Sequence, residues 1–378
     1  MSDLKESGGR NCVMNTRVKK RSLAGTILKT ILLILLIVVA AAAALIGYLT
    51  ATEYYPKAGE QETVPVMHEN DSVLTGSGPL RIMTWNVGYG ALGDNADFFM
   101  DGGSGVNTAT KDRVQENVSS MLDVIERENP DILFLQEVDL NSMRSHHTNE
   151  VQLFSDAFSG MESAFAYNFK VPFIPYPIPP IGTVNSGIVT LSSWHQTEVL
   201  REALPCPFSW PIRVANLKRC VLISRIPAPD SKELVLVNLH LEAYDSGEGK
   251  IAQTKQLREL LESEAGKGNY VIAGGDFNQV FSDTDIAKYP AQEGKWQAGE
   301  IDVNEFSSDL SFLMDSNVPT CRSLDQPYEG ADKENFQYYV IDGFIVSSNL
   351  EVKRLETLDE GFVSTDHNPV LLEVEMAG

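Results

Sequence analysis

The sequence predicts an α/β domain preceded by one membrane-spanning helix. Short apolar and β-branched runs, such as residues 81–87 and 234–241, have the composition of buried strands. Residues 111–128 place their apolar side chains on one face of a helix, which Pro130 ends. A second helix of the same kind is expected around residues 251–261. Strands that alternate with amphipathic helices are typical of an α/β fold.

The composition and charge of the chain limit the classes of function that it can have. With 378 residues, of which 43% are hydrophobic and 22% charged, the chain can bury a large core. Its formal net charge is −22. Residues 1–29 hold seven Lys or Arg and two acids, so the rest of the chain carries −27. A domain this acidic repels a polyanion, which disfavours nonspecific binding of nucleic acid.

Residues 30–50 form an uncharged apolar run that is long enough to cross a bilayer as a helix. Basic residues precede the run and acidic residues follow it, so the positive-inside rule keeps residues 1–29 in the cytoplasm. We therefore expect a single-pass anchor in the cell membrane, with the rest of the chain extracytoplasmic. A cleaved signal peptide is the alternative, because small residues occur at positions 50–52. The long basic segment and the long apolar core favour the uncleaved anchor.

Two stretches show neither strand nor helix periodicity. Residues 51–79 mix Gly, Pro, Ser, Thr and acids, which predicts a stalk or linker before a domain at residues 80–378. Residues 171–180, VPFIPYPIPP, have too many prolines for an interior strand and too many apolar groups for an ordinary loop. This segment either folds onto the body or contacts lipid or a partner.

The cysteines leave their bonding open. Cys12 precedes the apolar run, whereas Cys206, Cys220 and Cys321 follow it. Cys206 and Cys220 either form a disulfide or remain buried thiols, because spacing alone does not decide connectivity. No cysteine spacing suggests a zinc site.

A candidate site begins where the buried run at residues 270–275 ends and Asp276, Phe277 and Asn278 follow. Alternate side chains of an extended chain share a face, so Asp276 and Asn278 face one way while Phe277 packs inward. A carboxylate beside an amide suits a phosphate group under attack. A turn capped by these two side chains is the alternative when the stretch is taken alone.

Polar side chains also stand near the ends of the other predicted strands. They are Asn86, Glu137, His240, Asp342, Asp366 and His367. Each one alone is compatible with a structural role. Together, carboxylates and amides without a Cys/His cluster suit a hard cation, Mg²⁺ first, with Mn²⁺ and Ca²⁺ as alternatives.

Six short motifs that carry these residues occur in a fixed order along the chain. They are TWNV at 84–87, LQEV at 135–138, NLHL at 238–241, GGDFN at 274–278, IDGFIVS at 341–347 and STDHNPV at 364–370. From Leu80 to Glu375 this order resembles the endonuclease/exonuclease/phosphatase superfamily, which includes AP endonucleases, deoxyribonucleases, neutral sphingomyelinases and inositol-phosphate 5-phosphatases. The resemblance implies a four-layered α/β sandwich, in which two packed mixed β-sheets are flanked by helices. It also implies divalent-metal-dependent hydrolysis of phosphate esters.

The resemblance implies a metal site. By matching motif, Glu137 is the principal Mg²⁺ ligand, Asn86 lies beside it, and Asp366 contributes to the metal region. A cation held there would neutralise phosphate oxygens.

The resemblance also implies which residues act on the substrate. Asp276 would orient or deprotonate the attacking water, and Asn278 would donate a hydrogen bond to a phosphate oxygen. His367 would bind the phosphate, with Asp342 orienting its ring. His240 would lie near the leaving group. How these residues divide the roles of acid and base stays open.

Arg144 is a further candidate for binding a substrate phosphate. It follows Glu137 in a segment that also holds His146 and His147. An exposed polar loop is the alternative reading of this segment.

The sequence thus predicts a membrane-anchored, extracytoplasmic, Mg²⁺-dependent phosphodiesterase or phosphatase, which we expect to be a monomer. Phospholipid head groups fit the anchor, the acidic body and the apolar Pro-rich segment. An extracellular endonuclease or exonuclease is the second hypothesis, although the composition offers no basic groove for it. A non-catalytic binding module on the same fold is the third.

Overall fold

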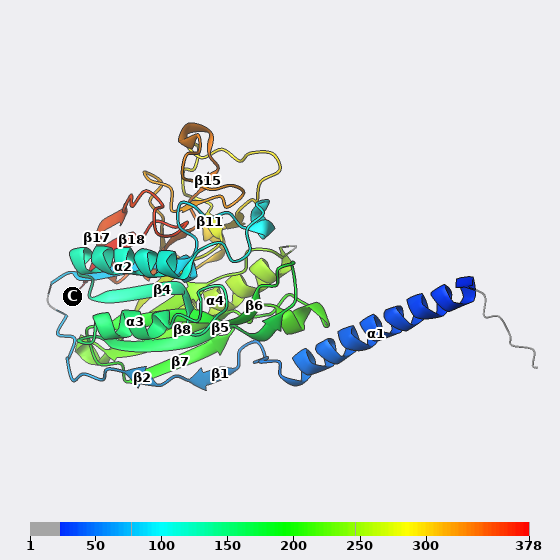
Figure 1. Cartoon of the computed structure of the whole chain (residues 1–378). Helices are drawn as coiled ribbons and strands as arrows, with labels where there is room; N and C mark the ends of the chain where they lie inside the picture. Colours follow the sequence, from blue (N-terminus) through cyan, green and yellow to red (C-terminus); the bar gives the residue numbers. More distant parts are fainter. Residues whose placement is uncertain (1–22, 77, 246, 378) are drawn as a thin grey trace, which may run out of the picture. The chain divides into compact units, whose positions relative to one another are not determined.

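The computed structural model describes residues 23–76, 78–245 and 247–377 and divides into two units, Met1–Tyr48 and Leu49–Gly378. Its first described helix, α1, spans Leu23–Ala51 (Figure 1) and contains the predicted apolar run. This helix is long and apolar enough to cross a membrane, and a signal sequence has the same properties. Cys12 and most of the predicted cytoplasmic segment lie outside the described residues.

Two seven-stranded mixed sheets form the second unit. In spatial order, the first sheet consists of β1 (Gln61–Thr63), β7 (Glu198–Ala203), β8 (Cys220–Pro227), β9 (Glu233–His240), β10 (Tyr270–Asp276), β16 (Asp342–Ser347) and β13 (Leu310–Leu313). The second consists of β17 (Leu350–Thr357), β18 (Val370–Met376), β3 (Leu80–Asn86), β4 (Ile132–Asp139), β6 (Gly182–Ser192), β5 (Glu162–Ile174) and β2 (Val66–Met67).

Short elements complete the unit. The pairs of short strands are β11 (Gln279–Phe281) with β12 (Gly299–Ile301), and β14 (Cys321–Arg322) with β15 (Tyr338–Tyr339). The 3-10 helices are η1 (Gly88–Gly90), η2 (Phe99–Asp101), η3 (Ile212–Ala215), η4 (Pro229–Ser231), η5 (Val303–Glu305) and η6 (Lys333–Asn335).

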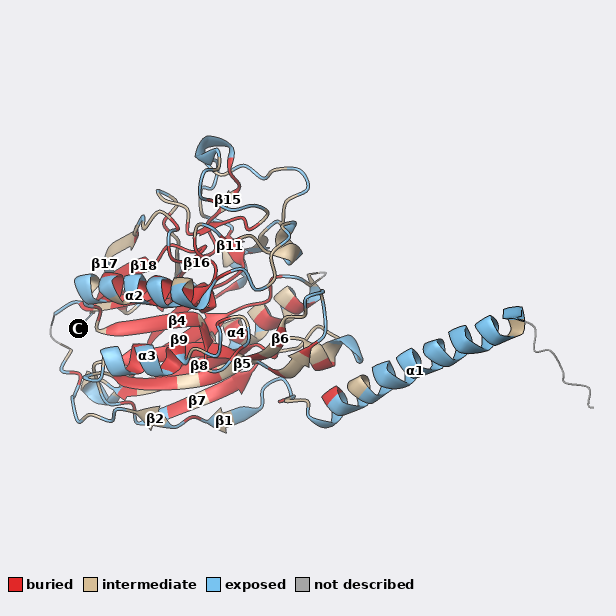
Figure 2. Cartoon of the chain, viewed as in Figure 1, coloured by how far each residue is buried: buried red, intermediate tan, exposed pale blue. Residues whose placement is uncertain are grey.

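Alternating side chains of the central strands build a four-layered core. Phe134 of β4 and Phe344 of β16 belong to the cluster between the two sheets. Leu133, the neighbour of Phe134, packs on the other face with residues of α2 (Lys111–Glu128) and α3 (Glu150–Ala157). Helix α4 (Glu248–Gly266) packs on the outer face of the first sheet. Figure 2 shows the central strands buried and the outward turns of α2 and α3 exposed, and two mixed sheets flanked by helices confirm the predicted four-layered sandwich.

The predicted stalk differs from what the structure shows. Residues 51–79 contain β1 and β2, which pair with the edge strands β7 and β5. Val64 and Leu74 are buried in the domain. Because these strands have three and two residues, they are too short for a period-two pattern to be visible in the sequence.

The apolar run at residues 336–347, FQYYVIDGFIVS, is divided between two strands. β15 ends at Tyr339 and β16 begins at Asp342. At this break, the backbone amides of Ile341 and Asp342 donate hydrogen bonds to Thr320 Oγ1, at 2.9 and 3.1 Å. A side chain from elsewhere in the sequence thus breaks an otherwise continuous apolar run.

The proline-rich segment is divided between body and surface. β5 continues through its first half, where Val171 and Ile174 are buried. The tip of the β5–β6 hairpin is exposed, with Tyr176 at 68% and Ile178 at 93% of full exposure. Cys206, Cys220 and Cys321 are free thiols.

One buried ion-pair network joins α4 to the first sheet. Arg225 Nη2 of β8 lies 2.7 Å from Glu264 Oε1, and Lys267 and Asn269 also donate hydrogen bonds to this carboxylate. Burial acts to raise the pKa of Glu264, but these bonds outweigh it and lower the pKa to about 2.

We expect Glu264→Gln to lower the free energy of unfolding by about 2 kcal/mol near neutral pH, because it leaves Arg225 without its buried partner. The carboxylate contributes fully above the pKa of an unfolded Glu, and its contribution is lost as the pH falls toward the folded value of about 2. The difference between variant and wild type should therefore shrink in acid. Urea unfolding of the full chain in detergent at about pH 7 and about pH 3 measures it.

Glu259→Gln is the matched control on the same helix. Glu259 is 63% exposed and pairs with Lys255 at 3.9 Å. Its replacement should change the free energy of unfolding by less than about 0.5 kcal/mol. Equal effects of the two variants would contradict a special role for the buried network.

Candidate active site

The predicted site residues lie together at one end of the two sheets. β3 runs parallel to β4, and β9 runs parallel to β10, so carboxyl ends of neighbouring strands meet. Asn86 ends β3 and Asp276 ends β10. Asn86 Nδ2 donates a hydrogen bond to Asp276 Oδ2 at 3.0 Å, which joins the two sheets at this point.

Glu137 is aimed into the site by a break in β4. The pairing of β4 with β6 shifts register between Leu135 and Val138, and Glu137 has φ of 56°. A left-handed backbone is strained for a glutamate, and a bulge turns a side chain away from its regular direction. As a result, Glu137 Oε1 accepts a hydrogen bond from Asn86 Nδ2 at 3.2 Å.

Asp276 reaches the site because two strands approach closely. A Cβ on Gly275 would lie 1.9 Å from the carbonyl oxygen of Leu239, so only glycine fits there. The register places Asp276 opposite His240 on β9. His240 Nε2 lies 3.3 Å from Asp276 Oδ2 and 4.0 Å from Glu137 Oε1.

Asn278 lies in a turn that also belongs to the site. Its φ is 52°, and its backbone amide donates to Asp276 Oδ1 at 2.9 Å. One N–H of its side chain donates to the Leu241 carbonyl at 2.9 Å. Phe277 between them is fully buried. The sequence left two alternatives for this stretch, a turn capped by Asp276 and Asn278 or a carboxylate beside an amide in the site. The structure has both features at once.

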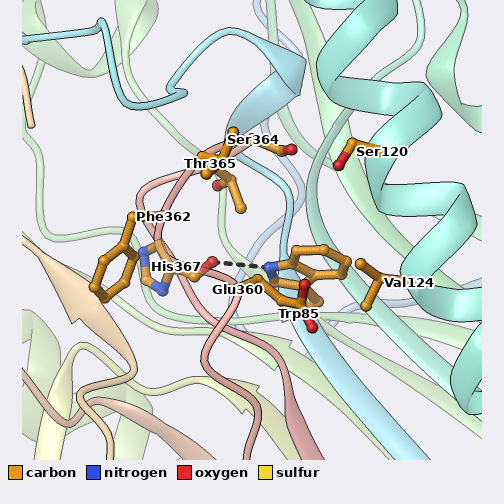
Figure 3. Close-up of a pocket in the computed structure, with 9 residues that line it drawn as sticks. Trp85, Ser120, Val124, Glu360, Phe362, Ser364, Thr365 and His367 are labelled. Atoms are coloured by element: carbon orange, nitrogen blue, oxygen red, sulfur yellow. Dashed lines mark hydrogen bonds between the residues drawn. The ribbon is translucent and has the colours of Figure 1, made fainter. Parts of the chain in front are cut away.

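His367 is fixed from both sides. Its Nδ1 lies 2.9 Å from Asp342 Oδ2, and Asp342 stands opposite Asp276 in the register of β16 and β10. Trp85 Nε1 donates to the His367 carbonyl at 2.9 Å (Figure 3). A proton on Nδ1 bonds to Asp342, which leaves Nε2, 3.8 Å from Asp276 Oδ2, facing the other carboxylates.

A small hollow lies beside this loop and is separate from the carboxylates. It is bounded by α2 and residues 360–367, and Trp85 and His367 are among its lining residues (Figure 3). Neither Glu137 nor Asp276 lines it.

The donor set fits a hard divalent cation. Asp276, Asp342 and His367 offer donor atoms within 4.8 Å of one another, and so do Cys321, Asp366 and His367. Asp342 Oδ1 is buried and has no hydrogen-bond partner among the described residues. Burial raises the pKa of the Cys321 thiol to about 12, which makes it a poor ligand. Oxygen donors dominate what remains, as Mg²⁺ prefers.

The two histidines favour opposite charge states. Burial lowers the pKa of His240 well below its ordinary value, and the charge of Arg219 lowers it further. Burial also acts to lower the pKa of His367, but Asp342 and other negative neighbours outweigh it and raise this pKa well above its ordinary value. Burial, with the charge of Asp342, raises the pKa of Asp276 to about 7. A neutral and a protonated imidazole thus flank one carboxylate.

Arg144 does not lie in an exposed position. Its side chain is 12% exposed and pairs with Asp139, with Nη2 3.0 Å from Oδ1 and Nε 3.2 Å from Oδ2. Burial raises the pKa of Glu137, and the positive charge of Arg144 opposes that rise. His146 and His147 are exposed. Substrate binding by Arg144 stays a prediction.

Several residues near the site were not identified from the sequence. Tyr244 donates a hydrogen bond to Asp101 at 3.0 Å, and burial raises the pKa of Asp101 to about 7, with smaller contributions from Asp366 and Glu137. Neither residue lies in a motif, and they are far apart in the sequence. Gln136 Nε2 donates a hydrogen bond to Asn238 Oδ1 at 2.8 Å between the sheets. The motifs LQEV and NLHL, which contain these two residues, could have identified them.

A family model and several solved structures are similar to this chain. A family model described as "Endonuclease/Exonuclease/phosphatase family" matches residues 83–367. No curated protein matches the chain.

Solved structures are similar at low identity. An endonuclease/exonuclease/phosphatase from Beutenbergia cavernae is 18% identical, with 79% of this chain and 72% of that chain covered and a TM-score of 0.53. Truncated Caenorhabditis elegans TDP2 is 14% identical, with 80% and 99% covered and a TM-score of 0.48. The human Nocturnin catalytic domain with bound sulfate is 17% identical, with 83% and 97% covered and a TM-score of 0.46. At this identity, the Beutenbergia protein supports the fold alone.

We expect Mg²⁺ to raise the thermal midpoint of the full chain by roughly a few degrees over the protein in chelator, because a ligand that binds only the folded state stabilises it. Glu137→Gln should lose most of this shift and most of the heat of Mg²⁺ binding in calorimetry. Glu126→Gln, at an exposed position of α2, should keep both. Wild-type Mg²⁺ affinity in Glu137→Gln would remove Glu137 from the metal site.

Proposed function

The chain belongs to the endonuclease/exonuclease/phosphatase family, and from this membership we propose that it is a metal-dependent phosphoric ester hydrolase anchored by α1. The catalytic domain faces away from the cytoplasm and acts on phospholipid head groups. One observation carries the proposal of chemistry. Five polar residues from separate strands and loops gather into one cluster, namely Asn86, Glu137, Asp276, His240 and His367.

Glu137, Asn86 and Asp366 hold the cation in this proposal. Mg²⁺, when bound, neutralises the phosphate oxygens and makes the phosphorus a better electrophile. The charges support this, because the buried Asp366 lies close enough to Glu137 to help raise the pKa of that carboxyl, and a cation between them would relieve the repulsion.

Asp276 holds the attacking water and takes its proton. The hydrogen bond from Asn86 fixes the position of its carboxylate. As the water oxygen bonds to phosphorus, the ester P–O bond breaks and the leaving oxygen takes a proton from solvent water. His240, which lies 3.3 Å from Asp276, faces that leaving group.

Asn278 and His367 bind the phosphate. One N–H of the Asn278 side chain bonds to Leu241, so the other is available for a phosphate oxygen. Asp342 holds the ring of His367 with Nε2 toward the reacting group. Both donors are preorganised, which favours the charge that develops on the phosphate.

Asp276→Asn should lower turnover roughly a thousandfold, because it removes the general base while keeping side-chain size. Its folded fraction, measured by circular dichroism, should match the wild type. Asp283→Asn, at an exposed position shortly after the site, should keep full activity. Activity of Asp276→Asn close to wild type, or absence of hydrolysis in the wild type on every phosphate ester tested, would favour the non-catalytic binding module.

Exposed apolar side chains near the site support a lipid substrate. Met100, Tyr176 and Ile178, here called the apolar rim, are 49%, 68% and 93% exposed. The rings of Phe99 and Tyr176 are 5.8 Å apart, and Phe99 begins η2. Asp101 ends η2 and is within electrostatic reach of the metal ligands. The rim can therefore contact acyl chains while a head group enters the site.

Replacing both Tyr176 and Ile178 by Ser should lower the ratio of turnover on phospholipid vesicles to turnover on a soluble phosphodiester. A decrease of roughly tenfold or more is expected, because each side chain loses apolar burial. The assay uses the full chain with sphingomyelin, other phospholipids, inositol phosphates and DNA, each with Mg²⁺ and with chelator. Preference for DNA with strongly salt-dependent affinity would favour the nuclease instead.

A further inference from the structure

The loop between β7 and β8 exposes two large apolar side chains. Trp210 is 56% exposed, and Ile212, the first residue of η3, is 63% exposed. Tyr55, 40% exposed, lies in the same patch, because the Arg213 guanidinium stacks 3.9 Å from the centre of its ring. Two aromatic rings and an isoleucine therefore face solvent together, and none of them belongs to the active site.

Hydrogen bonds fix this loop to the point where the apolar helix ends. Trp210 Nε1 donates to Thr50 Oγ1 at 3.0 Å, and α1 ends at Ala51. Arg213 Nε and Nη2 pair with the two carboxylate oxygens of Glu53 at 2.9 and 3.1 Å. The loop thus has a fixed distance from the first residues that follow the candidate membrane span.

That position sets the depth of the loop. A chain that leaves the hydrocarbon of a bilayer at the end of α1 places Thr50 in the interfacial region. A side chain bonded to Thr50 lies at the same level. The indole of tryptophan, apolar with one N–H donor, favours this region, as does the phenol of tyrosine.

The charges of the loop favour a neutral lipid surface. Lys218 Nζ lies 3.4 Å from Glu53 Oε1, and Arg213 pairs with the same carboxylate. These two cations are therefore already engaged and do not need an anionic lipid. What the loop offers outward is apolar surface, which gains by transfer into the zwitterionic interface.

We propose that Tyr55, Trp210 and Ile212 form a second membrane contact, which lies in the interface of the bilayer that α1 spans and restrains the tilt of the catalytic domain. This proposal rests on the membrane anchoring included in the proposed function. It does not depend on the hydrolytic activity or on the substrate.

Tryptophan fluorescence can test the contact in the full chain. The chain has four tryptophans, Trp85, Trp194, Trp210 and Trp296, and α1 contains none. In phosphatidylcholine vesicles that contain phosphatidylcholine brominated near the top of one acyl chain, Trp210 should be quenched. Trp210→Phe should lose most of the quenching, and Trp194→Phe should retain it.

A tryptophan moved along the loop gives an independent reading. In the Trp210→Phe background, Ile212→Trp should restore quenching. Val352→Trp, at a 37% exposed position on the edge strand β17, is the matched control and should not restore it. Circular dichroism verifies that each variant is folded.

Flotation of the same vesicles tests the membrane anchor separately from the loop contact. The loop contact would be overturned if the chain floats but Trp210→Phe leaves the quenching unchanged and Ile212→Trp adds none. The membrane anchor would then remain supported. The patch would then be open to a protein partner or a second copy of this chain. Chain that does not float would overturn the anchor and the loop contact together, whereas hydrolysis could still be measured in detergent.

Discussion

The structure depends on holding like charges together where they would repel one another. Four carboxylates stand at one end of the sheets: Asp276, Asp342 and Asp366 are buried, and Glu137 is half-buried. Such a group is unfavourable unless the backbone fixes it and nearby donors compensate it. The register of β9, β10 and β16 fixes it within the first sheet, and Asn86 connects it to the second. The large apolar core supplies the stability that this arrangement requires.

The backbone contributes to the same arrangement. Glu137 and Asn278 both have left-handed φ values. Glu137 lies at the irregularity inside β4, and Asn278 follows the end of β10. Each such residue costs on the order of 1 kcal/mol or more and persists only where its surroundings determine it. Such strain is expected where the direction of a side chain is more important than a low-energy backbone conformation.

The sequence predicted elements whose pattern is local. The helix at residues 111–128 coincides with α2, and the central strands appear as apolar runs because both of their faces are buried. Most site residues could be collected because they lie at or near a strand end within a short motif. Features set by distant partners could not be predicted: the Thr320 bonds that divide residues 336–347, and the Asp101–Tyr244 pair. Their partners are distant in sequence, and no periodicity marks them.

The two shortest strands of the domain have a consequence for work with the isolated protein. β1 forms the margin of the first sheet beside β7, and Gln61 Nε2 bonds to Glu202 there at 2.7 Å. β2 forms the margin of the second sheet beside β5. A recombinant fragment that starts at Leu80 would leave β7 and β5 with open backbone donors and acceptors, and two such fragments would aggregate through them. Expression without the apolar helix should therefore begin near Leu49, so that both sheets keep their covers.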